Sequence, residues 1–571
     1  MNYDKYPETK IIGFDHEAFG NLNAMKQELL KVTQDICYLT VDCYPGVDDE
    51  VFDFIVAVFQ PERIIKSEDV FYDKEQLNEL MQPHLTDDRV RGVMFYGKLE
   101  DFIDQSKLKK VKDRLQNHQK TLIYGVGAGL ISTGDCYIYC DLARWEIQCR
   151  YRAGMPNFKA ENYHEDSLRK IKRGFFIEWR IADKHKMKMF EQVDYFIDSN
   201  QKGHLKMITG SALRQGLKQI VKQPFRLVPY FDPGIWGGQW MKKHCNLDPN
   251  AKNYAWSFDG VPEENSLYLR YGQVKIEIPA MDLVLYQPIE LLGMKNYCRF
   301  GAEFPIRFDF LDTVDGQNLS LQVHPLTEYI KSHFGMTYTQ DESYYILDVQ
   351  DHGGVYLGLK ENIDPQAMIS DLKNAQTGKK TFEVDRYINF FPAKKHDHFL
   401  IPAGTVHCSS SGCMVLEISA TPYIFTFKLW DWDRLGLDGL PRPIHIDDGK
   451  NNIQWSRTTS WVQENLVNKI EIIHQDDDYL EEKTGLHELE FIETRRFTTD
   501  SKTYHHTNDG VQMLNLVAGS SAVIESPTNT FKPFVVHYAE TFIIPSIVNE
   551  YTIRPYHQGE TIKFIKAYVR N

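Results

Sequence analysis

The strongest constraint on the fold is a change of pattern near Phe225. Before this point, short apolar runs such as Ile36–Tyr44 and Tyr137–Cys140 alternate with amphipathic stretches such as Asp73–Met81. Strands that alternate with helices predict a mostly parallel α/β sheet. After Phe225, many short apolar runs are separated by Gly, Pro, Asn and Asp, which is typical of β-sandwiches, barrels and jelly rolls. The 571 residues therefore predict a multidomain protein, α/β first and β afterwards.

This pattern predicts three domains. We expect an α/β domain over residues 1–222, a β domain over residues 223–446 with a helical insert at Pro365–Asn374, and a second β domain over residues 453–571. Further candidate strands are Gly92–Tyr96, Leu122–Val126, Tyr195–Asp198, Ser343–Val349, Met414–Ile418 and Gln512–Val517.

Charge limits the classes of partner. The net charge is −14, from 65 Lys and Arg against 79 Asp and Glu. A general nucleic-acid-binding protein needs a broad positive surface, so we expect no nucleic-acid partner. Fourteen Lys and Arg against seven Asp and Glu lie between His164 and Arg226, however. This basic segment predicts either a solvated helix face or a surface that attracts phosphate.

The sequence favours a cytoplasmic protein. No stretch approaches the roughly 20 apolar residues that span a bilayer, and the start, MNYDKYPETK, lacks the basic and apolar regions of a signal peptide. The nine cysteines form no C-x-x-C pairs. We therefore expect no membrane partner, and the sequence predicts no particular oligomeric state.

Three segments combine residue types that bind metals, namely LSLQVHP (Leu319–Pro325), DESYYIL (Asp341–Leu347) and IPAGTVHC (Ile401–Cys408). On a strand, Gln322 and His324 would project from the same face, because alternate side chains do so. Glu342 begins a strand-like run, and His407 follows a turn with a glycine. If neighbouring strands bring these residues together, two imidazoles, one carboxylate and one amide oxygen suit zinc with an open coordination position.

In their order, these segments resemble the zinc-site signature of the type I mannose-6-phosphate isomerases, which are cupin proteins. Other segments are similar to the family in the same order: PGIWGGQWMKK (Pro233–Lys243), YAWSFDGVPEENS (Tyr254–Ser266), FPIRFDFLDT (Phe304–Thr313) and the block Val415–His445. The resemblance is close from about Pro229 to His445 and looser in the C-terminal region. It implies a jelly-roll cupin domain followed by a second cupin barrel.

The resemblance also implies a cofactor and a reaction. It implies one zinc per chain, bound by Gln322, His324, Glu342 and His407, and isomerisation of mannose 6-phosphate to fructose 6-phosphate through a cis-enediol. The small-molecule partner is then a sugar phosphate. Two alternatives remain: a sugar-binding regulator without turnover, and a metal-dependent cupin enzyme that acts on another sugar or, with iron, as an oxygenase.

The candidate catalytic residues lie in the terminal block of the family signature. The arginine of the family motif T-Y-R-x-Y-D is Lys428 here, and lysine offers a compact ammonium instead of a rigid donor fork. Arg434 matches a later arginine, with a structural ion pair to Asp431 or Asp433 as the alternative.

The general base is not fixed by the sequence. Lys428, His398 and Glu417 could each move the carbon-bound proton. Glu417 lies on the apolar run MVLEIS, where it can face the pocket or form a salt bridge at the edge of the core.

A glycine-rich segment marks the N-terminal region. IYGVGAGLI (Ile123–Ile131) follows a strand but fits neither G-x-x-x-x-G-K-[ST] nor G-x-G-x-x-G, so a tight strand–helix turn is favoured over a phosphate cradle. The layout faintly resembles a P-loop kinase domain without its Walker lysine. We expect a degenerate binding or structural domain.

Overall fold

The computed structural model describes residues 2–115, 119–420, 423, 425–437, 439, 441–485 and 487–570. The chain forms two compact units. The α/β unit comprises Glu8–Ile220 and Pro262–Gln287. The β-rich unit comprises Met1–Pro7, Val221–Val261 and Pro288–Asn571. The chain therefore passes from one unit to the other four times.

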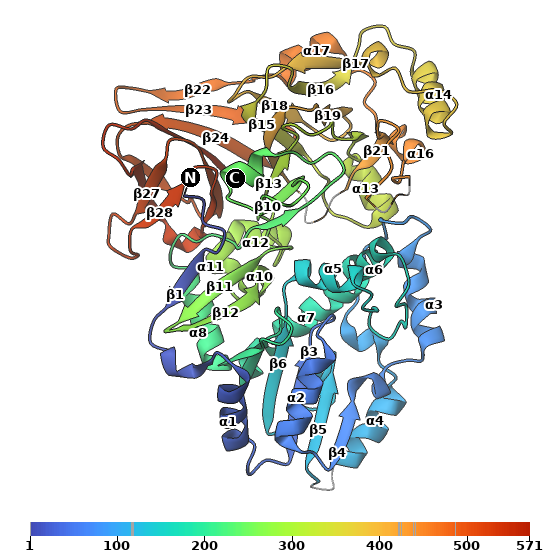
Figure 1. The fold of residues 1–571 in the computed structure, drawn as a ribbon, viewed down its shortest axis with the longest axis vertical. Helices are drawn as coiled ribbons and strands as arrows, with labels where there is room; N and C mark the ends of the chain where they lie inside the picture. Colours follow the sequence, from blue (N-terminus) through green and yellow to red (C-terminus); the bar gives the residue numbers. More distant parts are fainter. Residues whose placement is uncertain are drawn as a thin grey trace. The chain divides into compact units, whose positions relative to one another are not determined.

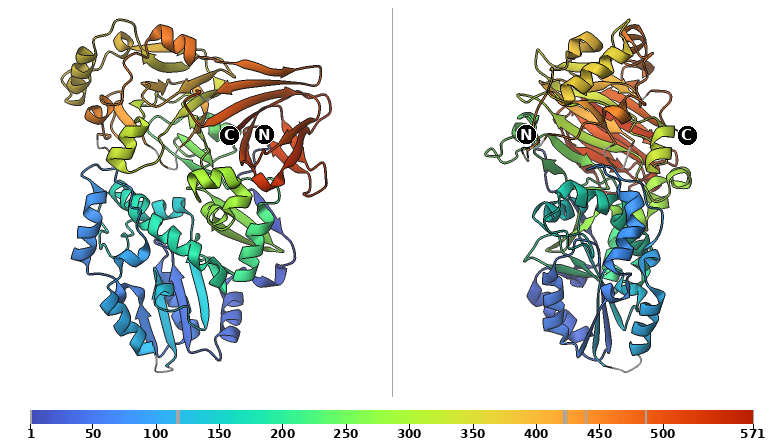
Figure 2. Two further views of the ribbon diagram at one scale, coloured as in Figure 1. Left: turned by 180° about the vertical axis from the view of Figure 1, so that it is seen from behind. Right: turned by 90° about the vertical axis from the view of Figure 1, so that its right-hand side faces the viewer.

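The α/β unit is built on a seven-stranded sheet in the order β2-β8-β7-β6-β3-β5-β4 (Figure 1). The five strands from β7 to β4 are parallel, while β8 is antiparallel to β7. Helices cover both faces of the sheet (Figure 2). This confirms the predicted parallel α/β arrangement. The strands are β2 (Ala18–Phe19), β3 (Tyr38–Cys43), β4 (Arg63–Lys66), β5 (Thr121–Gly125), β6 (Cys136–Asp141), β7 (Tyr195–Asp198) and β8 (Lys206–Thr209).

The helices of this unit follow the expected alternation with strands. They are α1 (Leu22–Val32), α2 (Asp49–Phe59), α3 (Lys74–Leu85), α4 (Gln105–Arg114), α5 (Arg144–Arg152), α6 (Ser167–Arg173), α7 (Trp179–Met189) and α8 (Gly210–Ile220). One predicted strand, Gly92–Tyr96, is wrong. The N–H groups of Val93 and Phe95 donate to the carbonyls of His84 and Phe176, so this segment is satisfied without joining the sheet.

Residues 262–287 belong to the α/β unit, although the sequence analysis placed them in the domain 223–446. They form β11 (Ser266–Tyr271), β12 (Val274–Pro279) and α10 (Ala280–Tyr286). β11 pairs in parallel with β1 (Glu8–Ile11) and antiparallel with β12. Strand pairing with residues far away in the sequence decides the boundary, and the composition of the segment does not show it.

The basic segment between His164 and Arg226 includes lysines that are buried. These lysines lie neither on a solvated helix face nor on a surface that attracts phosphate. Lys170 is fully buried and donates to the carbonyls of Met155 and Tyr163. Lys186 is 3% exposed, and its Nζ lies 2.5 Å from Asp141 Oδ2 and 2.7 Å from Asp282 Oδ1. Because Asp282 is on α10, this buried bridge ties residues 262–287 into the unit.

Replacing Lys186 with methionine is expected to destabilise the chain by about 3–5 kcal/mol, because two buried carboxylates lose their cation. Burial already raises the pKa of Asp141 and of Asp282, and the lysine opposes this rise. In the variant the folded state binds more protons than the unfolded state, so the loss should shrink as the pH falls. Equilibrium urea denaturation measures both effects.

The matched control is Lys188→Met on the same helix. Lys188 pairs with Glu100 at 2.7 Å, but its side chain is 52% exposed. An exposed pair contributes about 0–1 kcal/mol, so this variant should unfold close to the wild type. Equal losses in the two variants would contradict the assignment of the Lys186 bridge.

The β-rich unit contains two pairs of mainly antiparallel sheets. In the first pair, a six-stranded sheet has the order β18-β15-β20-β13-β10-β9 and a five-stranded sheet the order β17-β16-β19-β14-β21. The strands are β9 (Tyr230–Asp232), β10 (Trp256–Gly260), β13 (Arg307–Asp312), β14 (Leu321–Val323), β15 (Glu342–Val349), β16 (Gly354–Leu359), β17 (Ile388–Pro392), β18 (His398–Ile401), β19 (His407–Ser409), β20 (Cys413–Ser419) and β21 (Phe427–Trp430).

The second pair comes from the C-terminal region. Its sheets have the orders β22-β23-β24-β31-β26-β29 and β25-β30-β27-β28. The strands are β22 (Glu471–Gln475), β23 (Tyr479–Gly485), β24 (Ile492–Thr499), β25 (Thr503–His506), β26 (Gln512–Ala518), β27 (Ser521–Glu525), β28 (Phe534–His537), β29 (Thr541–Ile544), β30 (Glu550–Pro555) and β31 (Ile562–Val569). Two packed antiparallel sheets per region agree with the predicted jelly-roll class.

Short helices complete the β-rich unit. They are α9 (Trp240–His244), α11 (Pro288–Leu292), α12 (Met294–Phe300), α13 (Thr327–Phe334), α14 (Pro365–Gln376), α15 (Val384–Tyr387), α16 (Ile446–Gly449) and α17 (Thr459–Asn465). The predicted helical insert is α14. None of the helices that the structure describes has the length and apolar character needed to cross a membrane.

The first residues of the chain are held in the β-rich unit. The hydroxyl of Tyr3 donates to Asp259 at 2.5 Å. Arg226 donates to the carbonyl of Asp4 and forms a buried ion pair with Glu540 at 2.7 Å. The segment Met1–Pro7 therefore belongs with the β-rich unit instead of the predicted domain 1–222.

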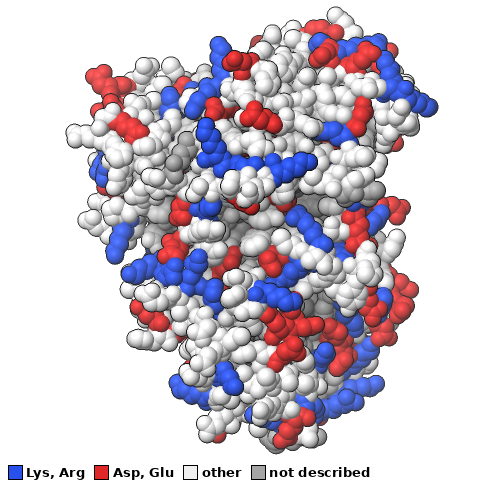
Figure 3. Space-filling view, viewed as in Figure 1, with Lys and Arg blue, Asp and Glu red and all other residues white. Residues whose placement is uncertain are grey.

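Basic and acidic side chains are interspersed on the face shown in Figure 3. Blue and red groups alternate over the elements of both units, and no broad region of this face carries one sign only. Charged side chains on this face are thus not gathered into one patch of a single sign.

Candidate metal centre

Three strands of the five-stranded sheet carry a row of polar side chains. Gln322 on β14 lies opposite His407 on β19 and opposite Lys428 on β21. Residues directly opposite one another on neighbouring strands point to the same face of a sheet. Gln322, His407 and Lys428 therefore share one face, and His324 follows Gln322 by two residues.

Glu342, at the start of β15 in the six-stranded sheet, meets two histidines of the other sheet. Its Oε2 lies 3.0 Å from Nε2 of His324, and its Oε1 lies 2.9 Å from Nε2 of His407. All three side chains are fully buried. Their potential ligand atoms lie within 4.8 Å of one another. Three of the four predicted ligands thus converge on one point.

Hydrogen bonds from Nδ1 fix the orientation of both imidazoles, so that Nε2 of each ring faces Glu342. Nδ1 of His324 donates to the carbonyl of Phe425 at 2.9 Å, and Nδ1 of His407 donates to the carbonyl of Thr405 at 2.9 Å. Metal-binding histidines commonly use their second nitrogen in this way. In the neutral form of each imidazole, which carries one proton, that proton is therefore on Nδ1 and Nε2 presents a lone pair toward Glu342.

The converging side-chain atoms of His324, Glu342 and His407 are better suited to bind a cation than to bind one another. Nε2 of His324 and Oε1 of Glu342 are buried and have no hydrogen-bond partner among the described residues. Burial raises the pKa of Glu342, but the charges of His324 and His407 in their protonated forms, and the hydrogen bonds that these forms donate, outweigh burial and hold its pKa well below the usual range; a bound cation would act in the same direction. Two imidazole lone pairs and an ionised carboxylate are a donor set for zinc.

Gln322 contacts His407, one of these three groups. Its amide Nε2 donates to Nε2 of His407 at 3.1 Å. A half-turn about the last side-chain bond would exchange the amide nitrogen and oxygen. The amide oxygen of Gln322 can therefore serve as the fourth ligand, as the sequence predicts.

A glycine turn positions the segment before His407. Gly404 has a φ of +88°, and its N–H donates to the carbonyl of His324 at 3.0 Å. A Cβ at this position would lie 2.9 Å from the carbonyl oxygen of Asn452, so only glycine fits. The turn thus connects the backbone of one histidine to the approach of the other.

Two charged side chains hold this turn from outside. The carboxylate of Asp341 accepts from the N–H of Ala403 at 2.8 Å, and burial raises the pKa of Asp341 to about 6. Arg457 donates to the carbonyls of Pro402 and Ala403 at 2.8 Å. The turn is therefore fixed by contacts that no local sequence pattern reveals.

Glu417 faces the same interior as Glu342. On β20 it lies opposite Tyr344, which is two residues beyond Glu342 on β15. Glu417 is 7% exposed, and burial, followed by the charges of Glu342 and Asp309, raises its pKa well above the ordinary value. Burial and these neighbouring charges thus favour the protonated form of its carboxyl group.

The two remaining cations of the predicted site differ in their surroundings. Lys428 is half-buried and shares the ligand face through its register with Gln322. Arg434 forms an ion pair with Asp431 at 2.6 Å, and Arg442 contacts the other oxygen of Asp431 at 3.0 Å. The structural alternative for Arg434 is therefore the arrangement observed.

His398 lies on the wrong face to act as the base. It is opposite Tyr345, whose side chain points away from the face of Glu342 and Tyr344. Its Nε2 shares a hydrogen bond of 2.8 Å with Ser343. Burial and the charge of Arg496 lower the pKa of His398 to about 3.

Gln340 is absent from the sequence predictions, although it lies two residues before Glu342. Its side chain is 3% exposed, and its Nε2 donates to Oε2 of Glu342 at 2.9 Å. The alternate-residue pattern that groups Gln322 with His324 would also have pointed to Gln340.

Several curated proteins are similar to part of this chain. The probable mannose-6-phosphate isomerase GmuF of Bacillus subtilis is 26% identical over 229 residues, which are 39% of this chain and 66% of the relative. The mannose-6-phosphate isomerase ManA of the same organism is 26% identical over 233 residues, 40% of this chain and 67% of the relative. The chain thus spans about two thirds of the length of these relatives. It is similar to the type I mannose-6-phosphate isomerases.

Solved structures of mannose-6-phosphate isomerases are also similar. The enzyme from Bacillus subtilis has a TM-score of 0.49 at 17% identity, covering 61% of this chain and 99% of the other. A mutant of phosphomannose isomerase from Salmonella typhimurium has a TM-score of 0.47 at 14% identity, covering 61% of this chain and 100% of the other.

A different match covers the region before the isomerase-like part. Residues 21–222 match a family described as a domain of unknown function, DUF8485. Within these residues, the glycine segment after β5 surrounds a carboxylate of the chain itself. Asp42, near the end of β3, accepts hydrogen bonds from the N–H groups of Gly127 at 2.8 Å and Gly129 at 2.9 Å. Tyr137 and His185 also contact Asp42.

The full chain is therefore expected not to hydrolyse ATP in the presence of magnesium. The two glycine N–H groups that could hold a phosphate are already bonded to Asp42, and the segment lacks the Walker lysine and Ser/Thr that phosphoryl transfer uses. Phosphate release measured against a protein-free blank tests this. Release that rises with protein concentration and needs magnesium would contradict it.

Proposed function

We propose that this protein is a zinc-dependent aldose–ketose isomerase that interconverts mannose 6-phosphate and fructose 6-phosphate. The observation that carries the proposal is the convergence of His324, Glu342 and His407 in a chain similar to mannose-6-phosphate isomerases. The orientation of both imidazoles by backbone carbonyls supports a site made for a metal ion.

One zinc per chain would be held by Gln322, His324, Glu342 and His407. When bound, zinc supplies a Lewis acid that stabilises the negative charge developing on the sugar oxygens during isomerisation. The burial of the three ligands in the sandwich excludes water, which strengthens this electrostatic effect.

The chain's own residues would handle the proton and the sugar anion. Isomerisation moves a proton between adjacent carbons through a cis-enediol, so the site needs a group that can hold a proton. Burial raises the pKa of Glu417, which makes its carboxylate, once ionised, a stronger base for the carbon-bound proton, and Lys428 shares the ligand face through its register with Gln322. We assign Glu417 to proton transfer and Lys428 to the phosphate or the enediolate.

Arg434 takes a supporting place in this proposal. Together with Arg442 it holds Asp431, which directly follows β21, the strand of Lys428. The two arginines would thereby fix the end of the strand that presents Lys428.

Metal analysis of the purified protein, combined with a coupled assay for fructose 6-phosphate formed from mannose 6-phosphate, tests the proposal. We expect about one zinc per chain and turnover that a chelator removes and zinc restores. Iron in place of zinc would favour an oxygenase, and bound zinc without turnover would favour a sugar-binding regulator. Either result would overturn the proposed function.

A further inference from the structure

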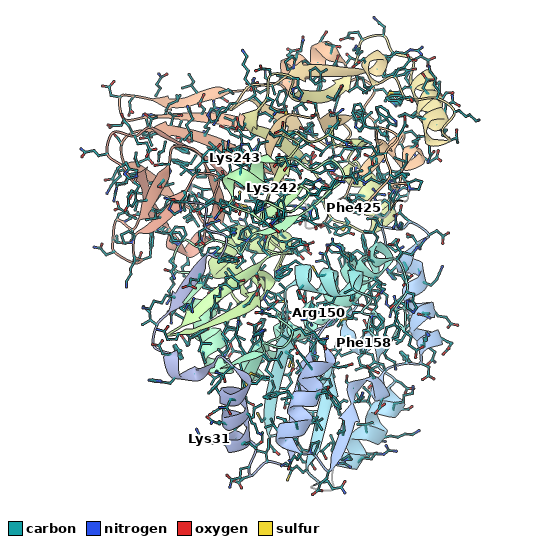
Figure 4. The ribbon with its side chains drawn as sticks, in the orientation of Figure 1. Lys31, Arg150, Phe158, Lys242, Lys243 and Phe425 are labelled. Atoms are coloured by element: carbon teal, nitrogen blue, oxygen red, sulfur yellow. The ribbon has the colours of Figure 1, made fainter. Side chains whose placement is uncertain are left out.

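One buried amide connects two of the candidate metal ligands. Gln340 donates through Nε2 to Oε2 of Glu342 at 2.9 Å and accepts through Oε1 from the N–H of Phe425 at 2.8 Å. The carbonyl of the same Phe425, labelled in Figure 4, accepts from Nδ1 of His324 at 2.9 Å. Glu342, Gln340, Phe425 and His324 thus form a closed chain of contacts, since Glu342 meets His324 at 3.0 Å.

The orientation of the amide is determined by its partners. A carboxylate can only accept, so it requires the NH₂ group of Gln340, and the backbone N–H of Phe425 can only donate, so it requires the carbonyl oxygen. No other assignment satisfies both contacts. Gln340 is 3% exposed, which removes water as a substitute partner.

The contacts reach beyond the ligands. Nε2 of Gln340 also lies 3.5 Å from Oε1 of Glu417. Phe425 precedes β21 by two residues, and β21 carries Lys428. One side chain therefore touches the carboxylate ligand, the segment that orients a histidine ligand, and the carboxyl group assigned to proton transfer.

We propose that Gln340 is the positioning residue of the metal centre, which couples the orientation of Glu342 to that of His324. This inference rests on the proposed metal site. Gln340 does not bind the ion; it restricts the carboxylate rotation and fixes the carbonyl that selects the proton position on His324. Partners of this kind typically change metal affinity by about 10- to 100-fold when they are lost.

The test compares Gln340→Leu with Gln512→Leu in the full chain. Gln512 is a matched control: it is 2% exposed, donates to the carbonyl of His506 at 2.7 Å and accepts from Tyr551 at 2.5 Å, but lies in the C-terminal pair of sheets. Both variants lose one buried amide that donates one hydrogen bond and accepts another at 2.9 Å or less. Zinc affinity, measured by competition with a chromophoric chelator, is expected to fall about 10- to 100-fold for Gln340→Leu and to stay unchanged for Gln512→Leu.

A spectroscopic measurement separates positioning from general loss of stability. With cobalt(II) in place of zinc, the visible absorption bands report the ligand geometry, so Gln340→Leu should change their position or intensity while Gln512→Leu should not. Unchanged affinity and unchanged cobalt bands in Gln340→Leu would overturn the inference. An equal fall in affinity in both variants would also overturn it, because the effect would then follow from any buried amide.

The outcomes also distinguish this inference from the proposed function. If the wild type binds zinc tightly but shows no isomerase activity, the proposed function fails while the role of Gln340 can still be measured. If the wild type is active and Gln340→Leu keeps its zinc affinity, the role of Gln340 fails while the function stands.

Discussion

His324→Ala and His407→Ala are expected to abolish zinc binding and isomerase activity together. Each substitution removes one of the two imidazoles and leaves Glu342 buried beside the other imidazole and the amide of Gln340. A site with two or three protein ligands loses most of the affinity of the full set, because the remaining donors no longer enclose the ion. Zinc content by elemental analysis and turnover in the coupled assay measure the two effects.

His333→Ala is the control for these variants. His333 is an exposed side chain of α13, so its removal should leave one zinc per chain and normal turnover. Stoichiometric zinc in both His324→Ala and His407→Ala would rule out this site as the metal centre. Loss of zinc in His333→Ala as well would point to a general effect on folding.

Lys428→Met is expected to lower turnover by about 100- to 1,000-fold, the effect of removing one charged contact to a developing anion. Lys428 stands on the face that carries Gln322 and His407, but it is not one of the predicted ligands. Zinc content and the far-ultraviolet circular dichroism spectrum should therefore stay as in the wild type. Steady-state kinetics with mannose 6-phosphate measures the loss.

The companion variant Lys428→Arg tests whether the site requires lysine or also accepts arginine for turnover of mannose 6-phosphate. Arginine presents a fork of donors that matches a phosphate, and lysine presents one compact charge. Lower or equal activity in Lys428→Arg agrees with a site shaped for lysine. Faster turnover of mannose 6-phosphate would indicate that the natural substrate is another sugar, and near-normal turnover in Lys428→Met would show that this position has no catalytic contact.

The sequence groups the candidate ligands through three short motifs whose order resembles a known family, and the structure brings the ligand atoms of His324, Glu342 and His407 within 4.8 Å of one another. Gln322 and His324 are two residues apart, so they are predicted to lie on the same face of a strand. Glu342 and His407 are the first residues of β15 and β19, and a short apolar run in the sequence predicts β15. The hydrogen bonds that support the candidate ligands join residues that are far apart in the sequence. Gln340 is joined to Phe425 across 85 residues of sequence, and Asp341 to Ala403 across 62, so no local pattern contains them.

The sequence predictions that were wrong also failed because of contacts between residues far apart in the sequence. The basic segment near α6 and α7 reads as a solvated helix face, yet Lys186 neutralises Asp141 and Asp282, which lie 45 and 96 residues away. The segment Gly92–Tyr96 has strand-forming residues, but its N–H groups find other carbonyls. Gly127 and Gly129 of the segment Ile123–Ile131 lie in a turn after β5, as the sequence favours, but only the fold shows that their N–H groups bind Asp42.

The four crossings of the chain between its units limit which segments can be deleted without harming both units. Deleting residues 1–222 would take away β1, the parallel partner of β11, together with the contacts that Tyr3 and Asp4 make in the other unit. The shortened chain would still carry residues 262–287, with the buried side chains of Leu269, Tyr271 and Ile276 deprived of their neighbours. Removing the α/β unit cleanly would need two excisions, because it has two segments, and removing the β-rich unit would need three. No single cut in the chain therefore separates the two units.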